Sequence, residues 1–261
     1  MTDQQLIAKS AADRMVLSGV GFDRLTESAV VDRVRAELAA GQGGSIVTPN
    51  IDILRTVRRD PRARGHVEAA SCVVADGAPL VWASRLRGDA LPERVAGSSL
   101  IWSLSEGLAT DRRSVYLLGG ASGVADRAAA ALAERYAGLR VAGTDCPPYG
   151  FEHDPEALAR VCASVVAVAP DVVYVGLGFP KQENLIARLA PLLPGTWFVG
   201  CGAAIAFVAG VQRRAPRWMQ RVGLEWLHRL GCEPTRLFRR YLVHDVPFAL
   251  GLLATSALRR R

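Results

Sequence analysis

The feature that most constrains the fold is a regular alternation of strand-like and helix-like segments along most of the chain. Residues 27–41, 123–138 and 155–170 place apolar side chains at helical spacing. Short runs rich in β-branched, aromatic and glycine residues surround them, at 15–22, 44–50, 71–77, 114–120, 139–145, 171–178 and 196–202. This alternation predicts an α/β, Rossmann-like fold, with a mostly parallel sheet and helices on both faces.

The pattern changes after residue 211, where strand-like runs stop and arginine becomes frequent. Residues 212–261 hold eleven arginines against three acidic side chains, a net charge of +8, so the rest of the chain carries −1 of the total of +7. We therefore predict a core domain, residues 1–211, followed by a basic, amphipathic helical appendage, residues 212–261. The positive charge of the appendage predicts that it contacts an anionic partner.

Two helices are expected in the appendage. In residues 215–230, Trp218, Trp226 and their apolar neighbours lie near one helical stripe, for which a packed core helix is a simple interpretation. Residues 246–258 are mostly apolar and end at Arg259, Arg260 and Arg261. This last segment is too short to span a bilayer, but it suits an interfacial helix whose arginines meet anionic headgroups.

The compartment is expected to be the cytoplasm. The five cysteines show no CxxC pair, zinc spacing or disulfide framework, as in a reducing environment. Residues 1–14 lack the apolar segment of a signal peptide, and no stretch offers about 18 uninterrupted apolar residues for a membrane span. We therefore expect neither secretion by that route nor a bilayer-spanning segment.

In residues 171–184, DVVYVGLGFPKQEN, a buried strand is followed by a glycine turn and then by a helix whose first residues are polar. Gly178 lets a ligand approach the backbone, and the helix that begins near Pro180 carries Lys181, Gln182 and Glu183 in its first turn. An ordinary strand-to-helix turn with a solvated first helical turn would look the same. The stretch is therefore a candidate ligand site only in combination with other signals.

Three further strand ends carry polar residues. Thr48 and Asn50 end one strand, and Asn50 is also a natural cap for the next helix. Asp76 lies at the end of another strand, where a carboxylate is either a helix cap or a general base. Arg94 lies in a nearby loop, as a phosphate clamp or as a surface residue.

Several standard sites are missing. The chain has no GxxxxGK[ST] phosphate loop, and GGASGVA at 119–125 lacks the GxGxxG register of a dinucleotide loop. The four histidines show no metal-ligand spacing and no DxD pair occurs, so we predict neither a metal nor another cofactor. The basic tail interleaves arginine with Trp and Leu rather than with a recognised nucleic-acid module, so nucleic acid is not expected as a partner.

Taken together, these motifs resemble the WecG/TagA/CpsF family of bacterial glycosyltransferases, from about Val16 to about Tyr241. The matching stretches are TPN (48–50), ADGAPLVWASRLRG (75–88), ERVAG (93–97), LLGG with GVA (117–125), PPYGF (147–151), GLGFPKQE (176–183), RAP (214–216) and GLEWLHRL (223–230).

The resemblance implies an inverting, metal-independent hexosyltransferase at the inner face of the cell membrane. It would move N-acetylmannosamine, its uronic acid or a related hexose from a UDP-sugar donor to a polyprenyl-diphosphate-linked sugar during cell-surface polysaccharide synthesis. The appendage would dock on an anionic membrane surface as a peripheral, cytoplasmic protein, and its exposed apolar surface makes a homo-oligomer a further expectation.

The resemblance also implies roles for individual residues. Asp76 would be the general base on the acceptor hydroxyl, with Thr48 and Asn50 in the same pocket. Arg94 and the glycine-loop residues would bind the donor, and arginines of the appendage would offset the charge of departing UDP. The complete set of predicted substrate-binding residues is Arg94, Gly178, Lys181, Gln182, Glu183, Arg214, Arg217, Arg229 and Arg236.

One position departs from the family pattern. The family usually reads G.G..FD..AG after its last core strand, whereas residues 200–210 place Ile205 and Ala206 at the FD positions. A missing carboxylate removes a hydrogen-bond acceptor for the nucleotide, worth about 1 to 3 kcal/mol. This leaves a second hypothesis open, in which the protein is a catalytically weak family member that acts as a binding or scaffold protein at the membrane.

Overall fold

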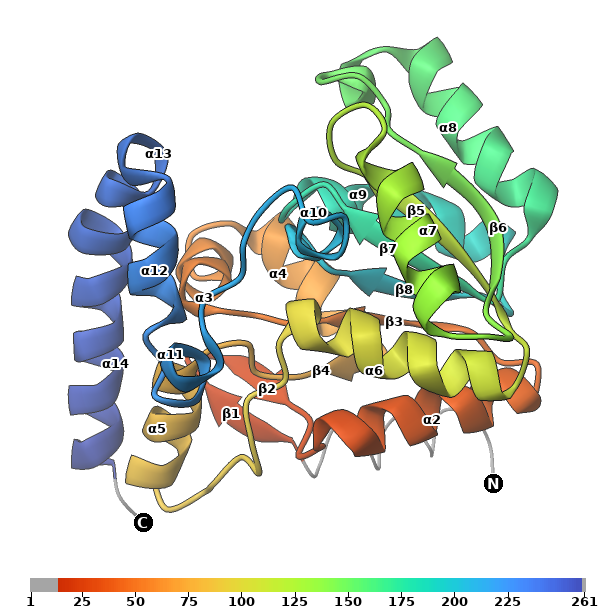
Figure 1. The fold of residues 1–261 in the computed structure, drawn as a ribbon. Coiled ribbons are helices and arrows are strands. Elements are labelled where there is room, and N and C mark those ends of the chain that lie inside the picture. The colour runs from red at the N-terminus through yellow and green to blue at the C-terminus, as the bar shows by residue number, and fades with distance from the viewer. Residues whose placement is uncertain (1–13, 260–261) are drawn as a thin grey trace.

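The computed structural model describes residues 14–259, and within that range six strands form one parallel sheet (Figure 1). Their order is β4-β3-β8-β7-β5-β6, and every neighbouring pair is parallel. The predicted Rossmann-like α/β fold is confirmed. The strands are β3 (Gly44–Val47), β4 (Cys72–Val73), β5 (Ser114–Gly119), β6 (Arg140–Asp145), β7 (Val172–Gly176) and β8 (Trp197–Gly200).

Residues 15–22 do not form the single strand that their composition predicts. They form an antiparallel hairpin of β1 (Met15–Leu17) and β2 (Val20–Phe22), separate from the main sheet. Ser18 and Gly19 both take positive φ, 50° and 80°, which turns the chain back within two residues.

Helices cover both faces of the sheet, as predicted, and the segments 27–41, 123–138 and 155–170 correspond to α2, α7 and α8. On one face lie α2 (Glu27–Ala39), α6 (Gly97–Thr110), α7 (Val124–Arg135) and α10 (Ala204–Val208). On the other lie α3 (Ile51–Val57), α4 (Pro61–Glu68), α5 (Ala78–Leu86), α8 (Pro155–Val168) and α9 (Lys181–Leu189), with the short turns η1 (Phe151–His153) and η2 (Ala190–Leu192).

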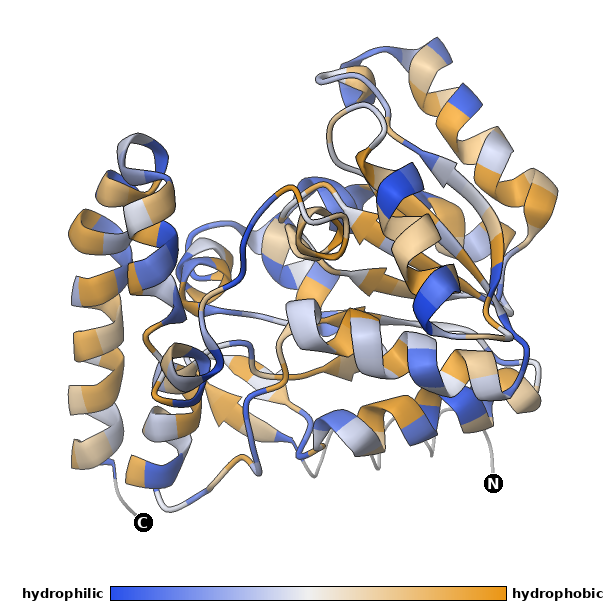
Figure 2. Ribbon diagram, in the orientation of Figure 1, coloured by the Kyte–Doolittle hydropathy of each residue, from blue (hydrophilic) through white to orange (hydrophobic). Residues whose placement is uncertain are grey.

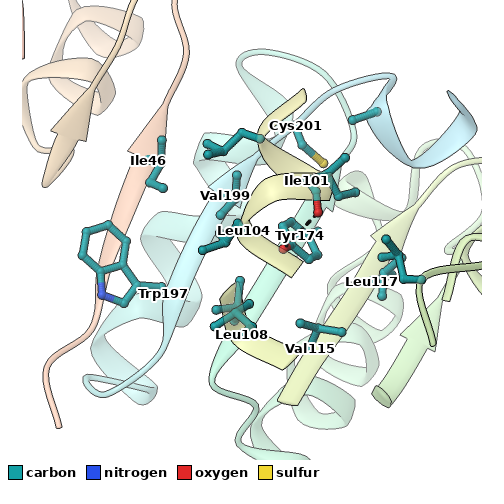
Figure 3. Packing of buried hydrophobic residues seen from close by; sticks show 14 of the residues in the cluster. Ile46, Ile101, Leu104, Leu108, Val115, Leu117, Tyr174, Trp197, Val199 and Cys201 are labelled. Atoms are coloured by element: carbon teal, nitrogen blue, oxygen red, sulfur yellow. Dashed lines mark hydrogen bonds between the residues drawn. The ribbon is translucent and has the colours of Figure 1, made fainter. Parts of the chain in front are cut away.

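Alternate side chains of the central strands enter opposite cores. On β7, Tyr174 packs with α6, whereas Val173 and Val175 pack with α8 and α9. Figure 3 shows Tyr174 among Ile101 and Leu104 of α6 and neighbouring strand residues. Strands that are buried on both faces are rigid supports, so loops at their carboxyl ends can hold a site in place.

The described part of the appendage is helical, but it differs in detail from the prediction. Residues 215–230 do not form one packed helix, because the chain breaks at Gly223 (φ 77°) and leaves Trp218 61% exposed and Val222 51% exposed. The helices are α11 (Arg217–Arg221), α12 (Glu225–Cys232), α13 (Pro234–Phe238), a π-helical segment η3 (Arg239–Asp245) and α14 (Val246–Leu258).

The last three of these elements form one continuous helix, Pro234–Leu258, of 25 residues. By length and composition it could cross a bilayer, which the apolar segment 246–258 alone could not. In the structure it lies against the core, where α14 packs on α5 and η3 on α3 (Figure 1). Figure 2 shows that α14 is hydrophobic along most of its length. Arg260, Arg261 and the N-terminal residues 1–13 lie outside the described residues.

Candidate active site

A cleft with a volume of about 770 Å³ lies at the carboxyl ends of the parallel strands. Its core side is formed by the loops that follow β3, β4, β5, β7 and β8, and its outer side by α12, α13, η3 and α14. From β3 the chain runs outward to β4 and then crosses to β5 on the other side of the sheet. Such a reversal of strand order is where open α/β sheets bind ligands.

Asp76 lies in this cleft, three residues after the end of β4. Its backbone N–H donates to the Pro49 carbonyl at 2.9 Å, which ties the β4 loop to the β3 loop. The residue at the cap of α5 is Gly77, and no side chain caps that helix, so Asp76 is not a helix cap.

The Asp76 carboxyl is partly accessible from the cleft and otherwise surrounded by protein. Burial raises the pKa of Asp76 to about 6, with Arg94 acting to lower it and Glu225 to raise it. A carboxylate with that pKa is mostly ionised at neutral pH and binds a proton more strongly than an ordinary aspartate. These are the properties of a general base.

Thr48 and Asn50 lie beside Asp76 in the cleft. Thr48 is buried, and Asn50 caps α3 by accepting a hydrogen bond from Ile53 N at 3.1 Å. Asn50 therefore caps α3 and lines the cleft at the same time.

A junction of three charged residues links the core to the appendage. Glu225, at the start of α12, accepts hydrogen bonds from Arg94 at 3.0 Å and from Arg214 at 3.1 Å. Arg214 also donates to the Ser98 carbonyl and to the Ser99 hydroxyl. Burial alone would raise the pKa of Glu225, but the two arginines outweigh it and lower that pKa. The carboxylate is therefore ionised and holds Arg94 at the cleft.

Three arginines of the appendage line the outer wall of the cleft. Arg229 lies over the Phe207 ring at 5.9 Å, and Arg236 pairs with Glu233 at 2.6 Å. Arg240 pairs with Asp52 of α3 at 3.0 Å and contacts Asp245 at 3.6 Å. Arg240 was not among the predicted site residues, because in the sequence it is one of many arginines in a charged tail.

The glycine loop after β7 also reaches the cleft, through Gly178 and Gln182. Gln182 is buried and accepts hydrogen bonds from Gly178 N and Gly202 N, both at 3.1 Å. Glu183 is buried behind it and does not line the cleft. Burial raises the pKa of Glu183 to about 7, against the lowering effect of its hydrogen bond from Gln182.

The structure does not bring every predicted residue into the cleft. Lys181 points to a different loop, where it pairs with Glu152 and lies 4.6 Å from the ring of Tyr149. Arg217 is exposed on α11. Arg214 does not line the cleft itself, but it contacts two residues that do, Glu225 and Ser98. Of the twelve predicted site residues, those that line the cleft are Thr48, Asn50, Asp76, Arg94, Gly178, Gln182, Arg229 and Arg236.

The end of the cleft next to α10 is lined mainly by apolar side chains, with Arg229 over the Phe207 ring. Ile205 is buried and packs closely against Gly176, where an added Cβ would lie 2.8 Å from the Ile205 side chain. Ala206, Phe207 and Leu177 line the same end. Among residues 14–259, no three side chains of the metal-ligating types gather at one place.

Comparison with known proteins places these features in one family. A family model described as "Glycosyl transferase WecG/TagA/CpsF family" matches residues 15–261. A protein of Bacillus spizizenii strain W23, named N-acetylglucosaminyldiphosphoundecaprenol N-acetyl-beta-D-mannosaminyltransferase, is 31% identical over 205 residues, which cover 78% of this chain and 77% of that protein.

Proteins with the same name from Staphylococcus aureus strain NCTC 8325 and Bacillus subtilis strain 168 are similar as well. The first is 27% identical over 227 residues, 85% of each chain, and the second is 28% identical over 194 residues, 74% of this chain and 73% of the other. The resemblance seen in the motifs is thereby confirmed, and this chain belongs to the WecG/TagA/CpsF family of glycosyltransferases.

Proposed function

We propose that this glycosyltransferase moves N-acetylmannosamine, its uronic acid or a related hexose from a UDP-sugar to a polyprenyl-diphosphate-linked N-acetylglucosamine in cell-surface polysaccharide synthesis. The names of the relatives supply the sugar and the lipid-linked acceptor. The observation that carries the proposal is Asp76, a carboxylate of raised pKa in a large cleft, with Arg94 beside it.

The reaction is a single in-line displacement that inverts the anomeric carbon. The acceptor hydroxyl oxygen attacks that carbon, the bond from the carbon to the UDP oxygen breaks, and UDP leaves with the electron pair. Asp76 takes the proton from the attacking hydroxyl, and Thr48 and Asn50 line the pocket around it.

The departing diphosphate carries negative charge that must be neutralised. Arg94 lies on the core side of the cleft, and Arg229, Arg236 and Arg240 lie on the appendage side. Guanidinium groups hydrogen-bond two phosphate oxygens at once and keep their charge at any physiological pH. We therefore propose that arginines, rather than a divalent ion, stabilise the leaving group.

We propose that the donor nucleotide binds at the end of the cleft next to α10. Phe207 and Leu177 offer apolar surface, and the glycine loops allow the backbone to approach the ligand. Ala206 lines this end without offering a hydrogen-bond acceptor from its side chain. That residue is the observation behind the alternative function, a weakly catalytic binding or scaffold protein.

Calorimetry with UDP distinguishes the two functions. We expect UDP to bind the wild type, and Ala206→Asp to tighten binding by about tenfold, because one hydrogen bond to a carboxylate is worth about 1 to 3 kcal/mol. Ala206→Asn is the matched control for charge. If neither the wild type nor Ala206→Asp binds UDP, the donor assignment is wrong and the scaffold function becomes the better account.

The appendage is the proposed membrane contact. Large apolar side chains stand exposed at intervals of about one or two helical turns along Pro234–Leu258, namely Phe238, Leu242 with Val243, Leu250 and Leu258. Arg239 on the same helix and Arg259 directly after it supply positive charge for anionic headgroups. We propose peripheral attachment at the cytoplasmic face of the membrane, with the cleft facing its lipid-linked acceptor. The domain boundary at residue 212, a homo-oligomer and the absence of nucleic-acid binding stay predictions.

A further inference from the structure

One buried glutamine joins the two glycine loops at the floor of the cleft. Gln182 Oε1 accepts hydrogen bonds from Gly178 N, in the loop after β7, and from Gly202 N, in the loop after β8, both at 3.1 Å. A single side-chain oxygen therefore fixes the separation of two loops that come from adjacent strands. Both loops line the end of the cleft that we assign to the donor nucleotide.

The neighbouring glutamate holds the nitrogen side of this amide. Gln182 Nε2 donates to Glu183 Oε1 at 2.8 Å, in a place where Glu183 is only 3% exposed. Because an amide donates from its nitrogen only, this bond turns Gln182 Oε1 toward the two backbone N–H groups. The same orientation leaves the second Nε2 hydrogen without an acceptor among residues 14–259.

Gly200 provides room for this pair of side chains. An added Cβ at Gly200 would lie 2.5 Å from Gln182 Nε2 and 2.9 Å from Glu183 Oε1. Atoms that are not bonded do not approach so closely, so the end of β8 must be bare for the arrangement to form. The Gln182 and Glu183 side chains of α9 therefore depend on glycine at position 200 of β8, and the three residues form one unit.

Stability alone does not account for a glutamate at this position. Glu183 Oε2 is buried without a hydrogen-bond partner in the described part of the chain, and no cation pairs with the carboxyl. An apolar side chain of similar size would avoid the cost of burying an unpaired polar atom. A stability cost of this kind at a binding site is typical of residues that serve function rather than the fold.

We propose that Glu183 is a positioning residue that orients the Gln182 amide and so sets the spacing of the β7 and β8 loops at the donor end of the cleft. This inference rests on the proposed function, because it assigns that end to the donor. Glu183 does not touch the donor, and it acts only through Gln182.

Steady-state kinetics of Glu183→Leu and Glu183→Gln test the proposal. Glu183→Leu removes the acceptor, so the donor KM should rise by about tenfold, as for the loss of one hydrogen bond. The acceptor KM should not change, and the Tm should change little, because the variant removes the unpaired Glu183 Oε2 but leaves Gln182 Nε2 without its acceptor. Glu183→Gln keeps an acceptor oxygen and should retain the wild-type donor KM. A Glu183→Leu variant with wild-type donor KM, or a Glu183→Gln variant as impaired as Glu183→Leu, would overturn the proposal.

Amide hydrogen exchange gives a readout that needs no turnover. In Glu183→Leu, exchange at Gly178 and Gly202 should accelerate together, while Gly210, bonded to the Phe207 carbonyl, serves as the control. Gly200→Ala tests the same unit from the β8 side and should raise exchange at both glycines. If the wild type transfers no sugar but the exchange pattern is as expected, Glu183 does position the two loops and the proposed function is wrong. Unchanged exchange at Gly178 and Gly202 in both variants would show that Glu183 does not position the two loops.

Discussion

Asp76→Asn is expected to lower kcat/KM for sugar transfer by about a thousandfold, within the range that removal of a general base produces. The asparagine has nearly the same shape but cannot accept the proton of the acceptor hydroxyl. No side-chain hydrogen bond of Asp76 is part of the fold in residues 14–259, and burial disfavours its ionised form, so the Tm of the variant at neutral pH should equal or exceed that of the wild type. Asp32→Asn, on the exposed side of α2, is the matched control and should retain full activity.

The pH dependence of the wild type tests the same assignment. Burial raises the pKa of Asp76 to about 6, so kcat/KM should rise as pH increases through about 6 and level off above it. The raised pKa also means that the folded protein binds this proton more tightly than the unfolded chain. Its contribution to stability is therefore present below the unfolded pKa of about 4 and lost as pH rises through about 6. Near wild-type turnover by Asp76→Asn would remove Asp76 from the mechanism.

Removal of residues 212–261 is expected to abolish transfer and membrane binding together. The truncated chain loses the outer wall of the cleft, with Arg229, Arg236 and Arg240, and it loses the apolar helix that we propose to lie on the membrane. Without guanidinium groups on that side, only water would offset the negative charge of the leaving diphosphate there. We expect sedimentation with phosphatidylglycerol vesicles to recover the full-length protein and not the truncated one.

A surface variant separates membrane binding from damage to the core. Truncation also uncovers α5, against which α14 packs, so the Tm of the truncated chain must be measured alongside. Val243→Glu with Leu250→Glu changes two exposed side chains and leaves the buried Leu237 and Leu252 in place. It should lose vesicle binding at wild-type Tm. Equal sedimentation of the full-length and truncated proteins would refute the docking role of the appendage.

Much of the fold was predictable because its signals are local. Most of the parallel strands are short apolar runs that end near glycine, whereas β3 ends at Thr48, Pro49 and Asn50. The predicted helix at 27–41 begins after Thr26, which caps α2 by accepting a hydrogen bond from Ala29 N at 3.1 Å. The hairpin at residues 15–22 was not predictable in the same way. Both of its strands are apolar, and the reversal at Ser18 depends on a positive φ that a serine rarely adopts.

The site residues that follow strands were predictable from the sequence. Thr48, Asp76 and Gly178 follow different strands, and parallel strands bring such residues to one edge of the sheet. The appendage arginines were harder to rank, because their contacts depend on how a separate helix packs on the core. Arg240 lines the cleft, whereas Arg217, in the same basic stretch, is exposed on α11.

Glu183 shows a further limit of reasoning from sequence. In the sequence it stands beside Lys181 and Gln182 in one polar cluster, which favours a shared role in ligand binding. Helical geometry sends neighbouring side chains in different directions, so Lys181 meets Glu152 outside the cleft and Glu183 lies buried behind Gln182. Three adjacent residues thus have three different surroundings.

The most direct test of the account is release of UDP by the purified wild-type protein in the presence of EDTA. The assay uses UDP-N-acetylmannosamine, its uronic acid and other UDP-hexoses as donors, with a short-chain polyprenyl-diphosphate N-acetylglucosamine as acceptor. We predict UDP release that requires the acceptor and continues without divalent ions. Release from none of the donors by folded protein, or release that EDTA abolishes, would contradict the proposed metal-independent transfer.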